Sequence, residues 1–131
     1  MKTATEIESG LAHCYGTEGY HRTLSPRLVH TDGVKTLAEM GECFWLVDAI
    51  VSHQSEAMKD DSLRYMQFWK LRKVEDTRSF VLECERDKDD IAISQTIEYS
   101  DFPLDEVSIW VERGSIDGIN PMMVMMLPSE H

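Results

Sequence analysis

The spacing of hydrophobic residues changes near residue 60, from a helical period before that point to strict alternation after it. In the first part, Thr31 precedes apolar residues at Val34 and Leu37, and Gly41 follows where a helix end often needs a positive φ. The pattern predicts a helix that begins after Thr31, whose hydroxyl can accept a hydrogen bond from the amide of Gly33 or Val34. A shorter helix is predicted over residues 3–14.

A second, strongly apolar helix is predicted over residues 42–53, where hydrophobic side chains occupy more than one face. We expect such a helix to be largely covered, with its single acid, Asp48, set among apolar neighbours. A desolvated acid of this kind is a candidate for catalysis. We favour a structural acid that accepts hydrogen bonds from the sheet or from a loop amide, because no second catalytic group accompanies it.

Beyond residue 63, apolar and polar residues alternate in the manner of half-buried strands. The predicted strands are Met66–Val74, Ser79–Glu85, Ile91–Tyr99, Glu106–Glu112 and Met122–Leu127. Helices followed by successive strands with short turns indicate an α+β fold. We therefore predict a single domain over residues 1–131, with N-terminal helices (about 1–58) packed on one face of a mostly antiparallel β-meander of about five strands (about 63–128).

Alternation along the fourth predicted strand points Trp110 away from Val107, Ile109 and Val111. If the strands are neighbours, Trp110 shares its side of the sheet with five glutamates: Glu83, Glu85, Glu98, Glu106 and Glu112. Aromatic side chains ringed by polar groups are enriched in binding hot spots. Trp110 is therefore either the centre of a binding surface with these carboxylates, or a residue packed under the C-terminal strand or across a dimer contact.

The last predicted strand, Met122–Leu127, carries four methionines around Val124 and is apolar on both sides. Methionine fills irregular space in protein cores, so this pattern is typical of a covered strand. The alternative is an exposed apolar strand at the edge of the sheet, which predicts a homodimer formed through Met122–Leu127.

Charge narrows the classes of partner. The chain has 131 residues and a net charge of −11, from 24 acidic residues against 13 lysines and arginines. The segment from Glu75 to Glu106 holds 11 acidic residues against three basic ones, a net charge of −8. This balance disfavours direct binding to nucleic acid, which needs a basic surface. It favours either a charged surface that keeps the protein soluble or one that meets a protein partner with a basic surface.

Composition and the cysteines bear on location. The hydrophobic content of 42% and the charged content of 28% are typical of a globular protein with one modest core. No apolar run reaches the ~20 residues that a membrane span needs, and the first ten residues lack an apolar signal core. The three cysteines, Cys14, Cys43 and Cys84, are odd in number and far apart. We therefore expect a cytoplasmic protein without membrane contact.

Motifs for metal binding and catalysis are absent from the sequence. The metal-capable residues His13, Cys14, His21, His30, Cys43 and His53 form no CxxC or HxxxH pair, which predicts scattered surface histidines and buried thiols and no metal. No GxSxG, Gly-rich phosphate loop or HExxH occurs, so no cofactor is predicted. An enzyme remains the alternative, with a pocket near Asp48 and His53 and with Cys43 as a further candidate.

Several stretches together resemble one small family of uncharacterised proteins, DUF6876. The stretches are GTEGYHR (16–22), TDGVKTLAE (31–39), FWLVDAIVSHQ (44–54), FWKL (68–71), IEYSDFPLDEV (97–107) and LPSE (127–130). The resemblance implies an origin in bacteria, phages or plasmids, and it implies no reaction, substrate, cofactor or catalytic residue. The chain departs from the family pattern in its charged turn, Arg86–Asp90, and in Ser115–Met126, which is longer. A role specific to this protein is expected near those two stretches.

We interpret the chain as a non-enzymatic, acidic binding protein from a mobile genetic element. In its sharper form the hypothesis is an inhibitor of a host nucleic-acid-binding defence factor, of the anti-CRISPR or anti-restriction type. Its carboxylates would then occupy lysines and arginines that normally hold phosphates.

Overall fold

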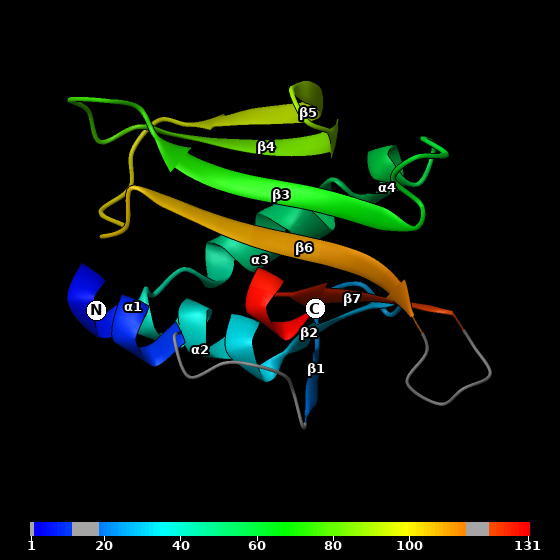
Figure 1. Ribbon diagram of the computed structural model, residues 1–131, viewed down its shortest axis with the longest axis horizontal. Coiled ribbons are helices and arrows are strands. Elements are labelled where there is room, and N and C mark those ends of the chain that lie inside the picture. Colours follow the sequence, from blue (N-terminus) through cyan, green and yellow to red (C-terminus); the bar gives the residue numbers. More distant parts are fainter. Residues whose placement is uncertain (1, 12–18, 115–120) are drawn as a thin grey trace.

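Helices and strands follow the two periodicities in the computed structural model, which describes residues 2–11, 19–114 and 121–131 (Figure 1). The helical elements are α1 (Ala4–Leu11), α2 (Asp32–Met40), α3 (Phe44–Ser52), α4 (Gln54–Ala57) and the 3-10 helix η1 (Pro128–Glu130). The strands are β1 (Tyr20–Arg22), β2 (Leu28–Thr31), β3 (Met66–Lys73), β4 (Phe80–Asp87), β5 (Asp90–Ile97), β6 (Glu106–Gly114) and β7 (Met122–Met126). The predicted α+β class is confirmed.

Local chemistry explains where α2 begins and ends. The Thr31 hydroxyl accepts a hydrogen bond of 3.3 Å from the amide of Val34, which confirms the predicted cap. Gly41 does close the helix, but its φ is −90°, so the expected positive φ at this glycine is wrong. Glu42 makes the turn instead, with a φ of 47°. Gly41 is needed for space, because a Cβ there would lie 2.7 Å from the ring of Phe102.

The sheet differs from the predicted antiparallel meander in size and order. Its described strands run β1-β2-β7-β6-β3-β4-β5, which is seven strands rather than about five. β3, β4 and β5 form two successive antiparallel pairs, but β6 then returns to pair with the other side of β3. β2 joins β7 in parallel, and β1 pairs with β2. These two N-terminal strands lie within the stretch that was predicted as the helical part.

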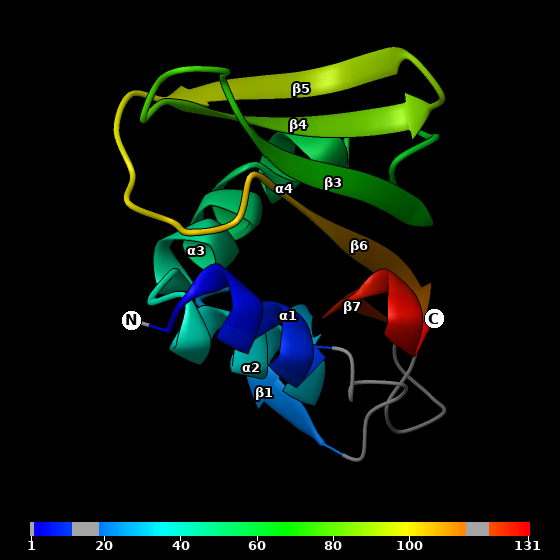
Figure 2. The ribbon, with the colours of Figure 1, turned by 60° about the vertical axis from the view of Figure 1, so that its left-hand side comes forward.

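The α-helices cover one face of this sheet, and the 3-10 helix η1 lies on the other. In Figure 1, α3 lies behind β3 and β6, whereas η1 lies in front of β7, and the turned view in Figure 2 separates the two layers. Leu46 and Ile50 of α3 form one buried cluster with Trp69 and Leu71 of β3 and with Leu82 of β4. The core therefore lies between the helices and this inner face of the sheet. The opposite surface, which we call the open face, carries the other side chain of each alternating pair.

Two expectations about single elements are corrected here. Asp48 is exposed on α3, and Phe44 one turn before it is 47% exposed, so the outer side of this apolar helix faces solvent. Asp48 is therefore neither desolvated nor packed against the sheet. β7 lies between β2 and β6, so Met122–Leu127 has no free edge for the homodimer considered above. None of the helices that the structure describes is both long and apolar enough for a membrane span.

Candidate functional site

Trp110 lies at the centre of the open face. It is half-buried, directly opposite Phe68 on β3 and Met126 on β7. The Trp110 and Phe68 rings meet edge to face, with their centroids 5.3 Å apart. On its other side, Trp110 packs against a small apolar cluster that includes Val29, Val124 and Met126. An aromatic and aliphatic patch therefore crosses the open face from β3 to β2, on the side of the sheet away from the main core.

Four of the five predicted glutamates share this face, and three of them form ion pairs within the described residues. Glu83 is only 6% exposed, and its carboxylate accepts hydrogen bonds of 2.9 and 2.6 Å from the Arg72 guanidinium. Lys70 Nζ lies 3.2 Å from Glu106. The open face is therefore mixed in charge rather than a bare acidic surface. The alternation that places Phe68 on this face also places Lys70 and Arg72 there, a consequence that the count of acids overlooked.

Two more of the predicted glutamates lie close to Trp110, and one does not. Glu112 on β6 pairs with His131 at 3.2 Å, and Glu85 lies opposite Phe68 on β4. Glu98 follows the end of β5, beside Phe80 at the start of β4. Phe80 and Glu85 are five residues apart along β4, or roughly 17 Å at the rise of an extended strand. Glu98 thus belongs to the far end of the sheet.

A pocket of about 300 Å³ opens beside Trp110 on this face. Its walls come from Phe68 and Trp110 and from Ser108, which is on β6 directly opposite Lys70. Trp69 also lines the pocket, together with four charged residues, two basic and two acidic: Lys70, Lys88, Glu85 and Asp87. An apolar base with a balanced charged rim is the composition of a protein-binding hot spot rather than of a site for a single ion.

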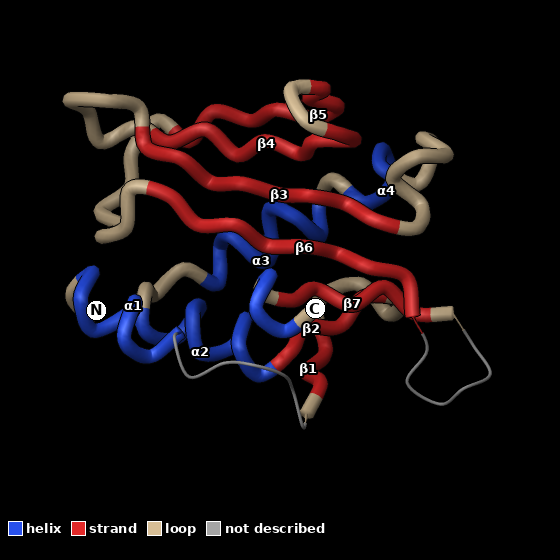
Figure 3. Tube along the Cα trace, viewed as in Figure 1, coloured by secondary structure: helices blue, strands red, loops and turns tan. Residues whose placement is uncertain are grey.

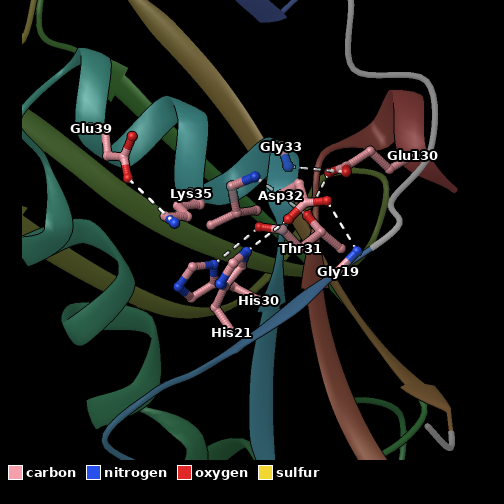
Figure 4. Close-up of polar contacts among 10 residues, drawn as sticks. Gly19, His21, His30, Thr31, Asp32, Gly33, Lys35, Glu39 and Glu130 are labelled. Carbon is pink, nitrogen blue, oxygen red and sulfur yellow. Dashed lines mark hydrogen bonds and ion pairs between the residues drawn. The ribbon is translucent and has the colours of Figure 1, made fainter.

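The C-terminal residues are held against this face by a clasp at the start of α2 (Figure 4). The Glu130 carboxylate accepts hydrogen bonds from the Thr31 hydroxyl at 2.6 Å, from the Gly33 amide at 3.2 Å and from the Leu127 amide at 2.9 Å. A carboxylate at a helix N-terminus is favoured both by free amides and by the helix dipole. The clasp fixes η1, and His131 then packs edge to face on Trp110 with a centroid distance of 5.3 Å.

A second group of polar contacts in Figure 4 ties β1 to the same helix start. Asp32 accepts hydrogen bonds from the Gly19 amide at 3.0 Å and from His21 Nε2 at 2.7 Å. The His21 and His30 rings stack with centroids 5.1 Å apart. His30 is 5% exposed, so the prediction of scattered surface histidines is wrong for this residue, and burial lowers its pKa. These contacts organise the fold around α2.

The residues proposed for catalysis are not brought together. Cys43 is buried, and burial raises the pKa of its thiol to about 12, which suppresses the reactive thiolate. His53 Nε2 lies 2.6 Å from Gln95 Oε1, and the His53 ring stacks on Trp69. Asp48 and His53 line neither the pocket beside Trp110 nor a second pocket between α4 and the ends of β2, β6 and β7. Asp48, His53 and Cys43 therefore share neither of these pockets, and the catalytic alternative gains no support from them.

Metal-capable side chains are likewise dispersed in the described part of the chain. There, no three histidine, cysteine or acidic side chains are arranged to hold a metal ion. His13 and Cys14, which the sequence also singled out, lie outside the described residues.

Comparison with known proteins gives a family but no function. Neither a curated protein nor a solved structure matches the chain. A family model does match residues 5–131, and its description is a family of unknown function, DUF6876. Because the match covers nearly the whole chain, this protein belongs to the DUF6876 family.

Proposed function

We propose that this protein acts without catalysis, by binding another protein through the open face around Trp110. One observation carries the proposal: a tryptophan, edge to face with Phe68, sits beside a pocket of about 300 Å³ on the side of the sheet away from the main core. Interface hot spots combine a buried aromatic anchor with a polar rim that excludes water. Lys70 and Glu85 supply such a rim.

The partner that fits best presents basic side chains next to an apolar anchor. Six exposed carboxylates gather where the β3–β4 turn and the β5–β6 loop meet, an end of the sheet that is visible in Figure 3. We call this the acidic end, and its members are Glu75, Asp76, Glu98, Asp101, Asp105 and Glu106. Backbone hydrogen bonds hold the segments together, from Ser100 to Arg78 at 2.9 Å and from Lys73 to Asp105 at 2.7 Å.

The acidic end joins the aromatic patch through β6. Glu106 and Trp110 are both on this strand and face the same way, four residues apart. Electrostatic attraction would steer a basic partner towards the acidic end, and desolvation of Trp110 would supply most of the affinity. In the described residues, Glu106 is the member of the acidic end that forms an ion pair, with Lys70. The other carboxylates are available to a partner's lysines and arginines.

A nucleic-acid-binding protein is the class of partner with the required surface. Its phosphate-binding lysines and arginines would be occupied by the acidic end, which would block nucleic acid. We therefore retain, as the sharper form of the proposal, an inhibitor of a host defence factor encoded by a mobile genetic element.

Affinity capture with matched variants tests the proposal. Wild-type protein, Trp110→Ala, Trp110→Phe, the charge reversal Glu75→Lys/Glu98→Lys/Asp101→Lys and the control Tyr20→Ala would each capture partners from an extract of the source organism. We expect one basic protein to be lost with Trp110→Ala and with the charge reversal, and kept by Trp110→Phe. Tyr20 is an exposed aromatic residue on β1, far from Trp110 in the strand order, so its substitution should leave binding unchanged.

Salt separates the two parts of the proposal. Raising the salt to about 0.5 M shortens the screening length to well under 10 Å and should weaken the captured complex. The purified partner should then release nucleic acid when this protein is added. Retention of every captured protein by Trp110→Ala would refute the binding face, whereas indifference to both salt and charge reversal would refute the electrostatic part.

A further inference from the structure

We propose a second, separate site: a pocket on the inner face of the sheet that binds a small anionic amphiphile, meaning an apolar body with one carboxylate or phosphate head. The pocket has a volume of about 400 Å³ and lies between α4 and the adjoining ends of β2, β6 and β7. It shares no lining residue with the pocket beside Trp110, so this inference stands independently of the protein-binding face.

The floor of this pocket is built from three neighbouring strands, and its apolar part comes from Leu28 and Met123. Leu28 on β2 is directly opposite Met123 on β7, and Met123 is directly opposite Arg113 on β6. Met58, beyond the end of α4, and Met122 add two further flexible thioether side chains. Methionine adapts its shape to an apolar guest and is over-represented at binding surfaces that accept varied ligands.

Three arginines line this pocket, and no acidic residue of the described chain lines it. Arg113 is positioned by a cation–π contact, with its Cζ 5.2 Å from the centre of the Tyr65 ring. Arg64 donates from Nε to the Met58 carbonyl at 2.8 Å and lies 3.0 Å from Asp61 through Nη1, which fixes it at the rim. Arg27 completes the group.

The charge of the lining selects the class of ligand. The pocket is lined by three arginines, of which Arg64 is paired with Asp61, in a chain whose net charge is −11, so it is a local exception to the acidic surface. Guanidinium groups bind carboxylates and phosphates through two parallel hydrogen bonds, and Arg113 is oriented by Tyr65 before any ligand arrives. A volume of about 400 Å³ suits a ligand of drug-like size with an apolar tail.

Methyl NMR of methionine detects such a ligand at the pocket itself. Three methionines line the pocket: Met58, which follows α4, and Met122 and Met123 on β7. Met125 and Met126 are also on β7 but do not line the pocket. Dodecanoate, dodecyl phosphate, dodecanol and acetate would be added below the concentrations at which they aggregate. We expect saturable shifts of the three lining methyl groups with the two anionic amphiphiles, and none with dodecanol or acetate. The stronger of the two anionic probes identifies the head group.

Arginine variants test the charge selection. Each rim charge is partly exposed and should change affinity a few-fold, so the double variant Arg27→Gln/Arg113→Gln is expected to weaken dodecanoate binding by about tenfold. Arg22→Gln is the matched control, because Arg22 is exposed on β1 and does not line the pocket. Circular dichroism checks that each variant is folded. The proposal is overturned by absent or non-saturable shifts, by equal shifts at Met125 and Met126, by dodecanol binding as well as dodecanoate, or by unchanged affinity in the double variant.

Discussion

Removing the Glu130 carboxylate should destabilise the protein through three donors at once. In Glu130→Ala, the Thr31 hydroxyl and the Gly33 and Leu127 amides each lose an acceptor that now lies 2.6 to 3.2 Å away. All three residues are buried, so water replaces the carboxylate only in part. The substitution also removes a negative charge from the N-terminus of α2, where the helix dipole favours it.

The size of the effect follows from these contacts. Losing a helix cap costs about 0.5–2 kcal/mol, and a hydrogen bond to a charged acceptor contributes roughly 1.5–3 kcal/mol. Glu130 is half-buried and solvent screens part of this, so we expect a loss of about 2–3 kcal/mol in the free energy of unfolding. For a domain of this size that lowers Tm by roughly 10 °C. The loss is a large fraction of the roughly 5–15 kcal/mol that stabilises a typical domain.

Urea unfolding followed by circular dichroism measures this loss, with Glu39→Ala as the matched control. Glu39 is also on α2, but it is exposed and pairs with Lys35 at 3.8 Å, a contact worth less than about 0.5 kcal/mol. Hydrogen exchange should also accelerate at the Gly33 amide in Glu130→Ala alone. If the two variants unfold within about 0.5 kcal/mol of one another, or if exchange at Gly33 is unchanged, the clasp does not stabilise the fold as argued.

Three further outcomes are expected. Gly33→Ala should destabilise the protein, although alanine favours helices by about 1 kcal/mol over glycine, because the new Cβ would collide with the Glu130 carboxylate. In a Glu130→Ala background this loss of stability should disappear, which a double-mutant cycle of urea unfolding would measure. Burial raises the pKa of the Cys43 thiol to about 12, so this thiol should react with a thiol reagent at pH 8 at least about 100-fold more slowly in the folded protein than in urea. The rates are measured in a variant whose other cysteines are serine, and an equally fast reaction of the folded protein would contradict the argument. Burial lowers the pKa of His30 below 6.5, so on acidification the unfolded chain binds a proton before the folded protein does. The contribution of His30 to stability is therefore full above pH 6.5 and is lost as the pH falls through the lower folded pKa. Urea midpoints measured from pH 8 to 5 should show this loss in the wild type and lack it in His30→Gln.

The sequence predicted those parts of the fold in which a single helix or strand buries one of its faces and exposes the other, because such a pattern depends only on residues close together in the chain. The cap at Thr31 needs only a hydroxyl three residues before a free amide, and it is present as predicted. The alternation of Phe80, Leu82 and Cys84 reports which side of β4 faces the helices, and all three are buried. Such patterns are readable because each one extends over several residues of a single element.

The parts that were missed depend on contacts between distant segments. β1 and β2 have three and four residues, too few for a period to show, and the four residues of β2 are all buried. The parallel pairing of β2 with β7 joins residues about 95 positions apart, as in Leu28 and Met123. Gln67 is fully buried although it is polar, because its side-chain amide exchanges two hydrogen bonds of 2.9 Å with Gln54.

The sequence predicted the central residue of the candidate site, Trp110, but its prediction of an acidic surface around this residue was wrong. Alternation placed Trp110 on the correct face, but a count of glutamates ignores the bases on the neighbouring strand. Lys70 and Arg72 become partners of Glu106 and Glu83 only once the register of β3 with β4 and β6 is known. Net charge can be counted along a sequence, but whether an acidic side chain is left unpaired depends on which residue lies opposite it in the sheet. The excess of acidic residues is therefore found at the acidic end rather than on the open face, where the sequence had placed it.

The two stretches expected to depart from the family pattern each border one of the two pockets. The charged turn Arg86–Asp90 contributes Asp87 and Lys88 to the pocket beside Trp110. The segment Ser115–Met126 contributes Met122 and Met123 to the arginine-rimmed pocket. Turns and strand ends at the margin of a sheet can change in length and charge without disturbing the core, which is why binding residues accumulate there. If specificity in this protein resides at those margins, exchange of the turn should alter protein capture and leave amphiphile binding unchanged. Substitution of Met123 alone should weaken amphiphile binding and leave protein capture unchanged, because Met123 lines the arginine-rimmed pocket whereas Val124 and Met126 pack with Trp110.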